Sequence, residues 1–511
     1  MTQPRTASTE FDPALRKLVI VVVLGAIMTI LDTTITSVAV NTLGAQFHTS
    51  LTAIQWVLTG YTLALSASIP LSGWAIVRFG PKTMWIVSLL LFITGSMLCA
   101  MAWNITALIM FRLLQGFGAG MILPIGQTML ARAAGPDRMG RVMSAVAVPA
   151  MLAPVLGPTV GGLILGHLSW RWMFYINVPL CAIAVIAAIR LLPSDPVRDR
   201  DIRLDILGLA LLSPGLGALV YGTSQAGSGT SLTDIRVIAS VLTGVVLVGC
   251  YVRHAARRGD EALVDVRLLR DRNFAAVNVM VFLYIGILSG LMALLPLYFQ
   301  TVNGDSPLRS GAMVAPLGLG AMATTLITGK LADKHSPRLL ILTGLPVVLL
   351  GILGLTQIGP STSDILVVAT LYVIGLGHGM IMPAAMGTSY QTLRHSEIPS
   401  ATTATNVGLR AGSSFGIAAL LVLIQRDIEH QTPGVDAFTR TVRTDELTQV
   451  LTHAFTHTYW WALAIGAVAV APALMLSRKS SPEAAPTAPE TDADAIDNRA
   501  RDQLTGVANE K

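Results

Sequence analysis

Four ionisable side chains interrupt long apolar stretches of this sequence: Asp32, Arg112, His378 and Arg410. Asp32 follows a run of almost purely apolar residues that begins at Leu18, and the chain stays largely apolar after it. A carboxylate at the centre of an apolar membrane helix costs roughly 2.5–3.5 kcal/mol on insertion scales, so it should face other helices rather than lipid. Because protonation removes its charge, such a carboxyl group is suited to exchanging protons.

Arg112 is the expected partner of Asp32. At 1.5 Å per helical residue, Asp32 lies about 13 Å and Arg112 about 10 Å from the same end of their helices. We therefore expect them to interact, directly or through Gln115 and water, and a nearby cation favours the ionised acid. A pair that only fixes helix packing is the alternative interpretation.

His378 and Arg410 allow more than one interpretation each. His378 takes the place that the small Ala119 has in a similar glycine-rich segment, so it points to a crowded interface. A packed, hydrogen-bonded histidine and a proton-handling one both fit this position. Arg410 lies near the middle of its segment, and we find no second acid within the apolar segments to pair with it. It could compensate an acid or contact an anionic or zwitterionic group of a ligand.

The segments that hold these residues are those of an all-α polytopic membrane protein. The 511 residues are 53% hydrophobic and 13% charged, and the mean hydropathy is +0.64, whereas soluble domains carry about 25% charged residues. A membrane-spanning helix needs about 20 apolar residues. On that basis the sequence predicts 14 transmembrane helices, near residues 18–41, 53–77, 83–103, 105–131, 141–166, 171–190, 204–224, 236–253, 274–300, 310–330, 338–357, 364–392, 398–425 and 455–477. Alternating strands of an outer-membrane barrel are absent from the pattern.

The distribution of charge predicts the orientation. If the N-terminus is cytoplasmic, most of the 35 Lys and Arg fall on cytoplasmic segments, as the positive-inside rule requires. This accounts for the net charge of +6 without a nucleic-acid partner. We expect both termini in the cytoplasm, with a disordered tail over 479–511. The three cysteines, Cys99, Cys181 and Cys250, fall inside expected spans and show no metal-binding spacing. We expect them to be buried small apolar residues.

An internal repeat divides the chain. GFGAGMILP (116–124) and GLGHGMIMP (375–383) share six positions, and the loops GWAIVRFGPK (73–82) and GKLADKHSPR (329–338) recur at nearly the same offset. The glycine runs lack the lysine of a phosphate loop and lie in apolar segments, so close helix packing is the favoured interpretation. The expected organisation is an N-terminus (1–14), a six-helix half (15–192), two inserted helices (204–253), a second six-helix half (270–478) and the tail.

At this point the sequence resembles the major facilitator superfamily, and within it the fourteen-spanner drug:proton antiporter branch (EmrB/QacA type). The resemblance covers nearly the whole chain before the tail, and it rests on four passages: LDTT (31–34), RLLQGFG (112–118), APVLGPTVGG (153–162) and SWRWMFYINVP (169–179). Four positions depart from the usual motifs. Ser37 and Asn41 replace an Asn and a Pro in the first motif, Val77 replaces the acid of the loop motif, and Pro81 replaces a basic residue.

The resemblance implies residue roles. It assigns proton coupling to Asp32 and Arg112. It assigns gating, with a bend that proline and glycine favour, to Pro154, Gly157, Pro158, Gly161 and Gly162. It also assigns a cytoplasmic loop motif to Gly73, Arg78, Gly80 and Lys82, with Gly329, Asp333 and Arg338 in the second copy. Because Val77 replaces the loop acid, the charge latch of that motif should rest on the C-terminal half or be weak.

The resulting hypothesis is a proton-coupled multidrug efflux antiporter of the cell membrane, which moves amphipathic small molecules by alternating access. It needs no cofactor, no metal and no nucleic acid, it works in the lipid bilayer, and it functions as a monomer. One intramembrane acid favours monocationic, neutral or zwitterionic cargo. A polar cavity is expected from Met28, Gln55, Trp56, Tyr61, Gln115, Gln127, Tyr284, His378, Met380 and Arg410.

Two other functions stay open at this point: export of an endogenous lipid, siderophore or antibiotic, and a non-transporting scaffold or channel. A channel would need a continuous polar path or charged rings, which we do not find. An enzyme is disfavoured because the sequence contains no HExxH or Walker-type motif.

Overall fold

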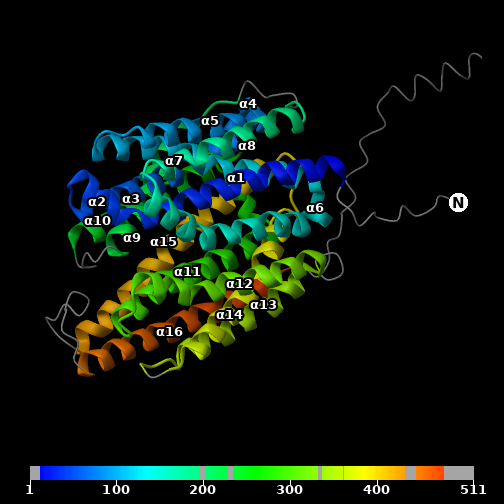
Figure 1. The fold of residues 1–511 in the computed structure, drawn as a ribbon. Coiled ribbons are helices and arrows are strands. Elements are labelled where there is room, and N and C mark those ends of the chain that lie inside the picture. Colours follow the sequence, from blue (N-terminus) through cyan, green and yellow to red (C-terminus); the bar gives the residue numbers. More distant parts are fainter. Residues whose placement is uncertain are drawn as a thin grey trace, which may run out of the picture. The chain divides into compact units, whose positions relative to one another are not determined.

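The computed structural model describes residues 12–195, 202–227, 234–331, 336–360, 362–431 and 445–476. Within them, every regular element is a helix (Figure 1). The α-helices are α1 (Pro13–Val38), α2 (Val40–Phe47), α3 (Leu51–Ser68), α4 (Leu71–Phe79), α5 (Pro81–Ala100), α6 (Ile105–His167), α7 (Trp172–Tyr175), α8 (Asn177–Leu191), α9 (Ile206–Gly227), α10 (Ile235–Arg258), α11 (Arg272–Thr301), α12 (Pro307–Leu331), α13 (Pro337–Leu355), α14 (Asp364–Thr388), α15 (Ile398–Gln431) and α16 (Asp445–Leu474). Two 3₁₀ turns, η1 (Gly259–Glu261) and η2 (Val266–Arg270), connect α10 to α11.

The number of spans differs from the expected fourteen. Twelve helices of the described residues are long and apolar enough to cross a membrane, and the bent pair α3–α4 would make thirteen. The expected span 141–166 is not among them: it lies inside α6, beyond the part Ile105–Gly135 that qualifies as a span.

Two backbone breaks have identifiable causes. The expected single span 53–77 is divided at Pro70, where α3 and α4 meet at a 54° bend, because proline removes a helix hydrogen bond and crowds the preceding turn. In α6 the non-helical residue is Gly135 (φ 69°), a left-handed conformation that glycine adopts without strain. At 157–162, where a bend is expected, the helix continues without a non-helical residue.

The helices α1 to α8 pack into an N-terminal bundle, and α11 to α16 pack into a C-terminal bundle (Figure 1). In both bundles, glycines of the repeated glycine-rich segments lie where two helices approach closely. A Cβ on Gly116 would lie 2.3 Å from the Tyr61 carbonyl oxygen of α3, and a Cβ on Gly375 would lie 2.0 Å from the Leu317 carbonyl oxygen of α12. The prediction that these glycines allow close helix packing is confirmed.

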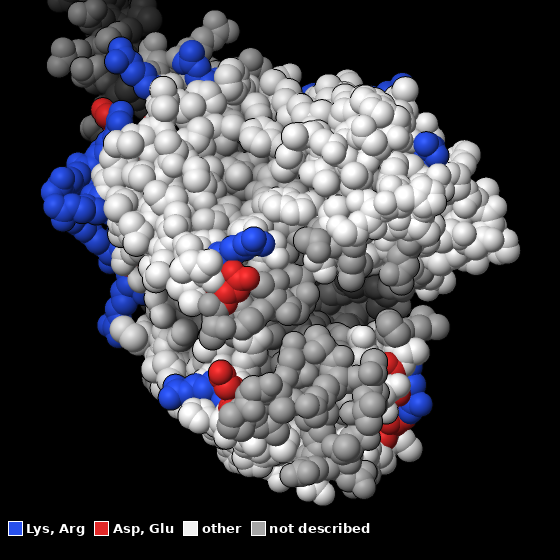
Figure 2. Space-filling model, turned by 90° about the vertical axis from the view of Figure 1, so that its left-hand side faces the viewer, with Lys and Arg blue, Asp and Glu red and all other residues white. Residues whose placement is uncertain are grey.

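Hydrogen bonds join the two bundles near one end, the end at which α1 begins. Thr128 of α6 pairs with Thr402 of α15 at 2.7 Å, and the Asn406 amide donates to the Gln127 side-chain oxygen at 2.7 Å. All the groups in these contacts are neutral. Figure 2 views the opposite end and shows a recess between the N-terminal bundle above and the C-terminal bundle below.

The inserted helices α9 and α10 pack on each other, and α9 also contacts α3 and α15. Asp205 ties their ends together. Its carboxylate accepts hydrogen bonds from the Gly208 and Leu263 backbone N–H groups and lies 3.0 Å from His254 Nε2 and 3.3 Å from Arg258 Nη1. Burial alone would raise the pKa of Asp205, but the hydrogen bonds from Gly208, His254 and Leu263 outweigh it and lower that pKa.

Candidate functional site

The carboxylate of Asp32 and the guanidinium of Arg112 form a buried ion pair. Their Oδ2 and Nη1 atoms are 2.6 Å apart, and both side chains are 0% exposed. Apolar residues of α1 and the close-packed glycines of α6 bring the two together inside the N-terminal bundle. The expected contact is therefore direct and needs no bridging water.

Two further side chains complete the hydrogen bonding of the carboxylate. Gln115 Nε2 and Asn177 Nδ2 donate to Asp32 Oδ1 at 2.8 and 2.7 Å. Arg112 Nη1 also donates to Gln115 Oε1 at 2.8 Å, and its Nε donates to the Val57 carbonyl oxygen at 3.2 Å. Since a buried charge is tolerated only when it is paired and hydrogen-bonded, this cluster is arranged for the ionised form of Asp32.

Two aromatic rings lie beside the Arg112 guanidinium. The ring of Tyr61 lies 4.1 Å from the Arg112 guanidinium carbon, and the ring of Phe174 lies 5.7 Å from it. These distances allow cation–π attraction. Among the described residues, Arg112 Nη2 has no hydrogen-bond partner.

The sequence-based reasoning missed Asn177 and Ser96. Asn177 stands in the quoted SWRWMFYINVP passage but was not singled out, and its amide also donates to Ser96 Oγ at 3.1 Å. Both side chains are buried. A buried asparagine at the start of a span is the signal that points to it, because an amide in an apolar helix needs partners as a charge does.

Protonation of Asp32 would change each of the contacts that its carboxylate makes. Arg112 would lose its counter-charge, and a neutral carboxyl group is a weaker acceptor for the three donors. Leaving a buried charge uncompensated is unfavourable, so uptake of a proton favours a different arrangement of α1, α6 and α8. The charge state of Asp32 therefore affects the contacts that hold α1, α6 and α8 together.

The motif residues of α6 lie against α1, one turn beyond Asp32. A Cβ on Gly157 would lie 2.0 Å from Thr34 Oγ1, and one on Gly161 would lie 3.3 Å from the Ile35 carbonyl oxygen. Gly162 has nothing within 4 Å of such a Cβ. The backbone at 154 and 158 is helical. Gly157 and Gly161 thus set how closely α6 approaches the helix that carries Asp32.

Replacing Gly157 by alanine should therefore displace α1, whereas replacing Gly162 by alanine should not. Overpacking of a tight interface costs about 1–3 kcal/mol. We expect a lower melting temperature and reduced transport for Gly157→Ala in detergent-purified protein and in vesicles, and unchanged values for Gly162→Ala. Equal behaviour of the two variants would contradict the close approach.

In the C-terminal bundle, the Tyr284 hydroxyl and His378 Nδ1 are 2.8 Å apart, and their rings stack at 5.8 Å. The hydrogen-bonded alternative for His378 fits this contact. Gln127 pairs with Asn406 between the bundles. Arg410 is partly exposed and lies on α15 one turn beyond Asn406. Met380 is partly buried.

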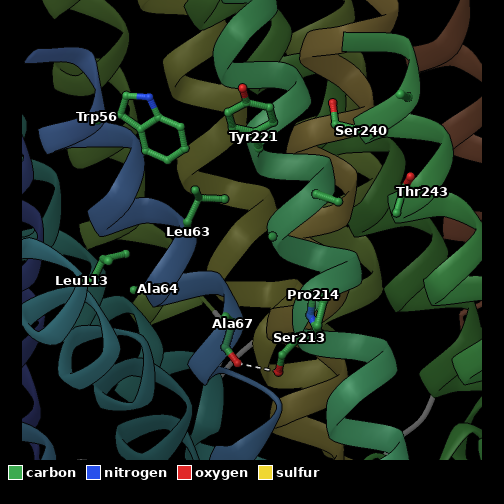
Figure 3. Close-up of a pocket in the computed structure, with 13 residues that line it drawn as sticks. Trp56, Leu63, Ala64, Ala67, Leu113, Ser213, Pro214, Tyr221, Ser240 and Thr243 are labelled. Atoms are coloured by element: carbon green, nitrogen blue, oxygen red, sulfur yellow. Dashed lines mark hydrogen bonds between the residues drawn. The ribbon is translucent and has the colours of Figure 1, made fainter. Parts of the chain in front are cut away.

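Other residues expected in the cavity lie elsewhere. Met28 is 1% exposed within the apolar core, and Gln115 belongs to the Asp32 cluster. Trp56 stacks on Tyr221 of α9 at 5.5 Å. With the inserted helices it lines an apolar groove of about 740 Å³ between α3, α9 and α10, in which Ser213 donates to the Ala67 carbonyl oxygen at 2.6 Å (Figure 3). Gln55 is half-buried on α3.

The loop after α4 uses a different acid from the one that the motif leads us to expect. Asp195, after α8, accepts hydrogen bonds from the backbone N–H of Lys82 at 2.7 Å and from the Thr83 hydroxyl at 2.5 Å. Lys82 Nζ in turn donates to the Leu192 carbonyl oxygen at 2.7 Å. The loop therefore joins α5 to α8 within one bundle, beside Gly80 at φ 90°.

Contacts to the other bundle at this loop are neutral. Ser72 and Thr403 lie 3.2 Å apart, and a Cβ on Gly73 would lie 2.8 Å from Thr403 Oγ1. Arg78 is partly buried. In the second copy, a Cβ on Gly329 would lie 3.0 Å from Ser144 Cβ. Arg338 donates to the Leu476 carbonyl oxygen, and Asp333 lies outside the described residues. Cys99 and Cys181 are buried as expected, but Cys250 is exposed on α10.

Two helical bundles with a buried charge pair inside apolar spans define a multi-pass membrane protein of the transporter class. The Major Facilitator Superfamily model matches residues 22–417. The chain belongs to this family and is a transporter rather than an enzyme. Members of the family act on small-molecule substrates within the lipid bilayer, typically as monomers, and those named for multidrug resistance sit in the cell membrane.

Named relatives and a solved structure agree with this assignment. A "Multidrug resistance protein B homolog" of Mycobacterium tuberculosis is 37% identical over 431 residues, 83% of this chain and 79% of that protein. A "Putative multidrug resistance protein MdtD" of Shigella sonnei is 30% identical over 68% of this chain and 73% of that protein. The proton:xylose symporter XylE has a similar fold, with a TM-score of 0.59 at 14% identity over 90% of this chain and 94% of that chain.

Proposed function

We propose that the protein is a proton-coupled antiporter that exports amphipathic small molecules, of the fourteen-spanner drug:proton branch of its superfamily. The observation that carries the proposal is the carboxyl group of Asp32. It is buried within an apolar helix, is balanced by Arg112 and accepts three side-chain hydrogen bonds. A group that is costly to bury and titratable is most often retained in a membrane helix for a functional reason.

In this mechanism the charge of Asp32 selects between two arrangements of the bundles. The ionised form fits the observed cluster, in which Arg112, Gln115 and Asn177 converge on the carboxylate. The protonated form leaves the Arg112 charge uncompensated and favours the other arrangement. A proton that enters from one side and leaves to the other can thus drive the exchange of conformations.

Alternating access is supported by where the bundles touch. Neutral hydrogen bonds close the end at which α1 begins, and the opposite end has a recess (Figure 2). With a cytoplasmic N-terminus, as the Lys and Arg distribution predicts, this is an outward-open arrangement. These hydrogen bonds join neutral groups, so separating the bundles at this end does not require breaking ion pairs. We also propose that the part of α6 beyond Gly135 crosses the membrane separately, and that α3–α4 is one bent span, which makes fourteen.

The multidrug-resistance names of the relatives support drug-like cargo. The test is transport in vesicles of the purified protein with an imposed pH gradient, using a panel of amphipathic dyes that differ in charge. In vesicles that contain the protein, adding a transported dye should change the proton concentration inside. A protonophore, which dissipates the pH gradient, should abolish uphill movement of the dye. Dye transport that is unaffected by the pH gradient and by the protonophore would overturn proton coupling.

A further inference from the structure

Arg410 lies on the face of α15 that is turned toward the N-terminal bundle. In a helix, residues three and four apart share a face, so Thr403, Asn406 and Arg410 project in similar directions. Thr403 contacts Ser72 of α4, and Asn406 contacts Gln127 of α6. Arg410 is the next position on this face toward the recessed end, one turn beyond the Gln127–Asn406 pair.

The guanidinium of Arg410 makes no hydrogen bond or ion pair with any described residue, although it lies at mid-helix. Arginine stays protonated and carries five donors in a planar fork. Arg112 has its counter-charge in Asp32, so the two cancel. At this depth, the charge of Arg410 is the one that the described side chains leave uncompensated.

A second hydrogen-bond donor, the Tyr61 hydroxyl, lies near Arg410. The Tyr61 hydroxyl is fully buried, and its side-chain neighbour Thr33 lies within hydrogen-bonding range but outside good hydrogen-bond geometry. It is an electrostatic neighbour of Arg410, while its ring covers the Arg112 guanidinium at 4.1 Å. A phenol hydroxyl can donate to an oxygen anion, so such an anion is a ligand that both Arg410 and Tyr61 can bind.

We infer that Arg410 and Tyr61 form a subsite for an anionic group of the exported molecule, such as a carboxylate, sulfonate or phosphate. This inference rests on the proposed function and deepens it. Oxygen anions match the arginine fork with two parallel hydrogen bonds, and the phenol supplies another. The cargo is then an amphipathic molecule with one acidic group, which replaces the monocationic or neutral cargo that a single intramembrane acid suggests.

An anionic cargo has a consequence for the driving force. Entry of one proton in exchange for export of one monoanion moves two positive charges inward in each cycle. Exchange of one proton for one monocation moves none. Because each charge responds to the membrane potential, a potential that is negative inside should accelerate export of the monoanion and leave export of the monocation unchanged.

The experiment compares two dyes of similar size in vesicles at a fixed pH gradient: one with a single carboxylate and one with a single quaternary ammonium group. A potassium diffusion potential is imposed with valinomycin. In the wild type, carboxylate-dye transport should rise with the potential and quaternary-dye transport should not. Arg410→Gln should weaken binding of the carboxylate dye by about tenfold, which is about 1.4 kcal/mol. Tyr61→Phe, which keeps the ring over Arg112, should weaken it less.

The matched control is Arg426→Gln, which removes an equal charge from an exposed position of the same helix. It should behave as the wild type. Equilibrium binding of the carboxylate dye to detergent-purified, monodisperse protein separates the subsite from the transport cycle. Unchanged binding in Arg410→Gln would overturn the subsite even if transport is proton-coupled. Weakened binding in a protein that moves no protons would support the subsite and contradict the antiport.

Discussion

Replacement of Asp32 by asparagine is expected to abolish proton-driven efflux while downhill movement of the cargo persists. Asparagine has nearly the same shape but cannot exchange a proton, so the charge of the cluster no longer changes through the cycle. Coupling between sites in proteins is typically about 5–150-fold in affinity, and the variant should reduce the effect of the pH gradient on uphill transport to about nothing.

The measurement is dye efflux against a concentration gradient, with and without an imposed pH gradient, together with dye exchange at equal pH. Asp364→Asn is the matched control, because Asp364 forms an exposed ion pair with Arg309 at 2.8 Å in the other bundle. It should retain wild-type efflux. Uphill efflux at the normal rate in Asp32→Asn would refute the assignment of Asp32 as the proton site.

Replacement of Arg112 by methionine is expected to be the most destabilising single change in the cluster. The buried carboxylate of Asp32 would lose its counter-charge, and breaking a buried pair by removing one partner costs about 3–5 kcal/mol. The double variant Asp32→Asn/Arg112→Met removes both charges and should be more stable than Arg112→Met alone. Close partners commonly show interaction energies of about 0.5–3 kcal/mol in such cycles.

Thermal unfolding in detergent at neutral pH, followed for the wild type, both single variants and the double variant, measures this interaction. Arg112→Lys supplies a second comparison. It keeps the charge, but a single ammonium group lacks the planar fork that reaches Asp32, Gln115 and the Val57 carbonyl oxygen together. Strictly additive effects of the two single substitutions would mean that Asp32 and Arg112 do not depend on each other.

The Asp32–Arg112 contact could be predicted from the sequence, because an apolar helix exposes the cost of a charge. Asp32 and Arg112 have opposite charges, lie at similar depth and each need a partner, so the sequence predicts that they pair. Asn177 was harder to find. It reaches Asp32 across 145 positions of the chain, and a neutral amide produces a much weaker hydropathy signal than a charge does.

The glycine-rich stretches also differ in how well the sequence predicted their structural role. The glycines at 116–120 predicted close packing, because a missing side chain has one obvious use where two helices approach. The Pro-Gly-rich stretch 157–162 predicted a bend. In the structure the helix continues there, and Gly157 and Gly161 lie close to Thr34 and Ile35 of α1. A local glycine pattern is compatible with close helix packing or with a bend, and the position of the neighbouring helix determines which of them occurs.

The sequence by itself determined the apolar segments, the rare charges within them and the repeat, since each of these follows from the cost of placing a residue type in lipid. Only the tertiary structure decided that Trp56 faces the groove beside the inserted helices and that Arg410 faces the N-terminal bundle without a partner. Lipid tails are as apolar as a protein interior, so hydropathy does not distinguish the lipid-facing side of a helix from the packed side. The rotation of each helix, and with it the residues that meet, is settled by packing.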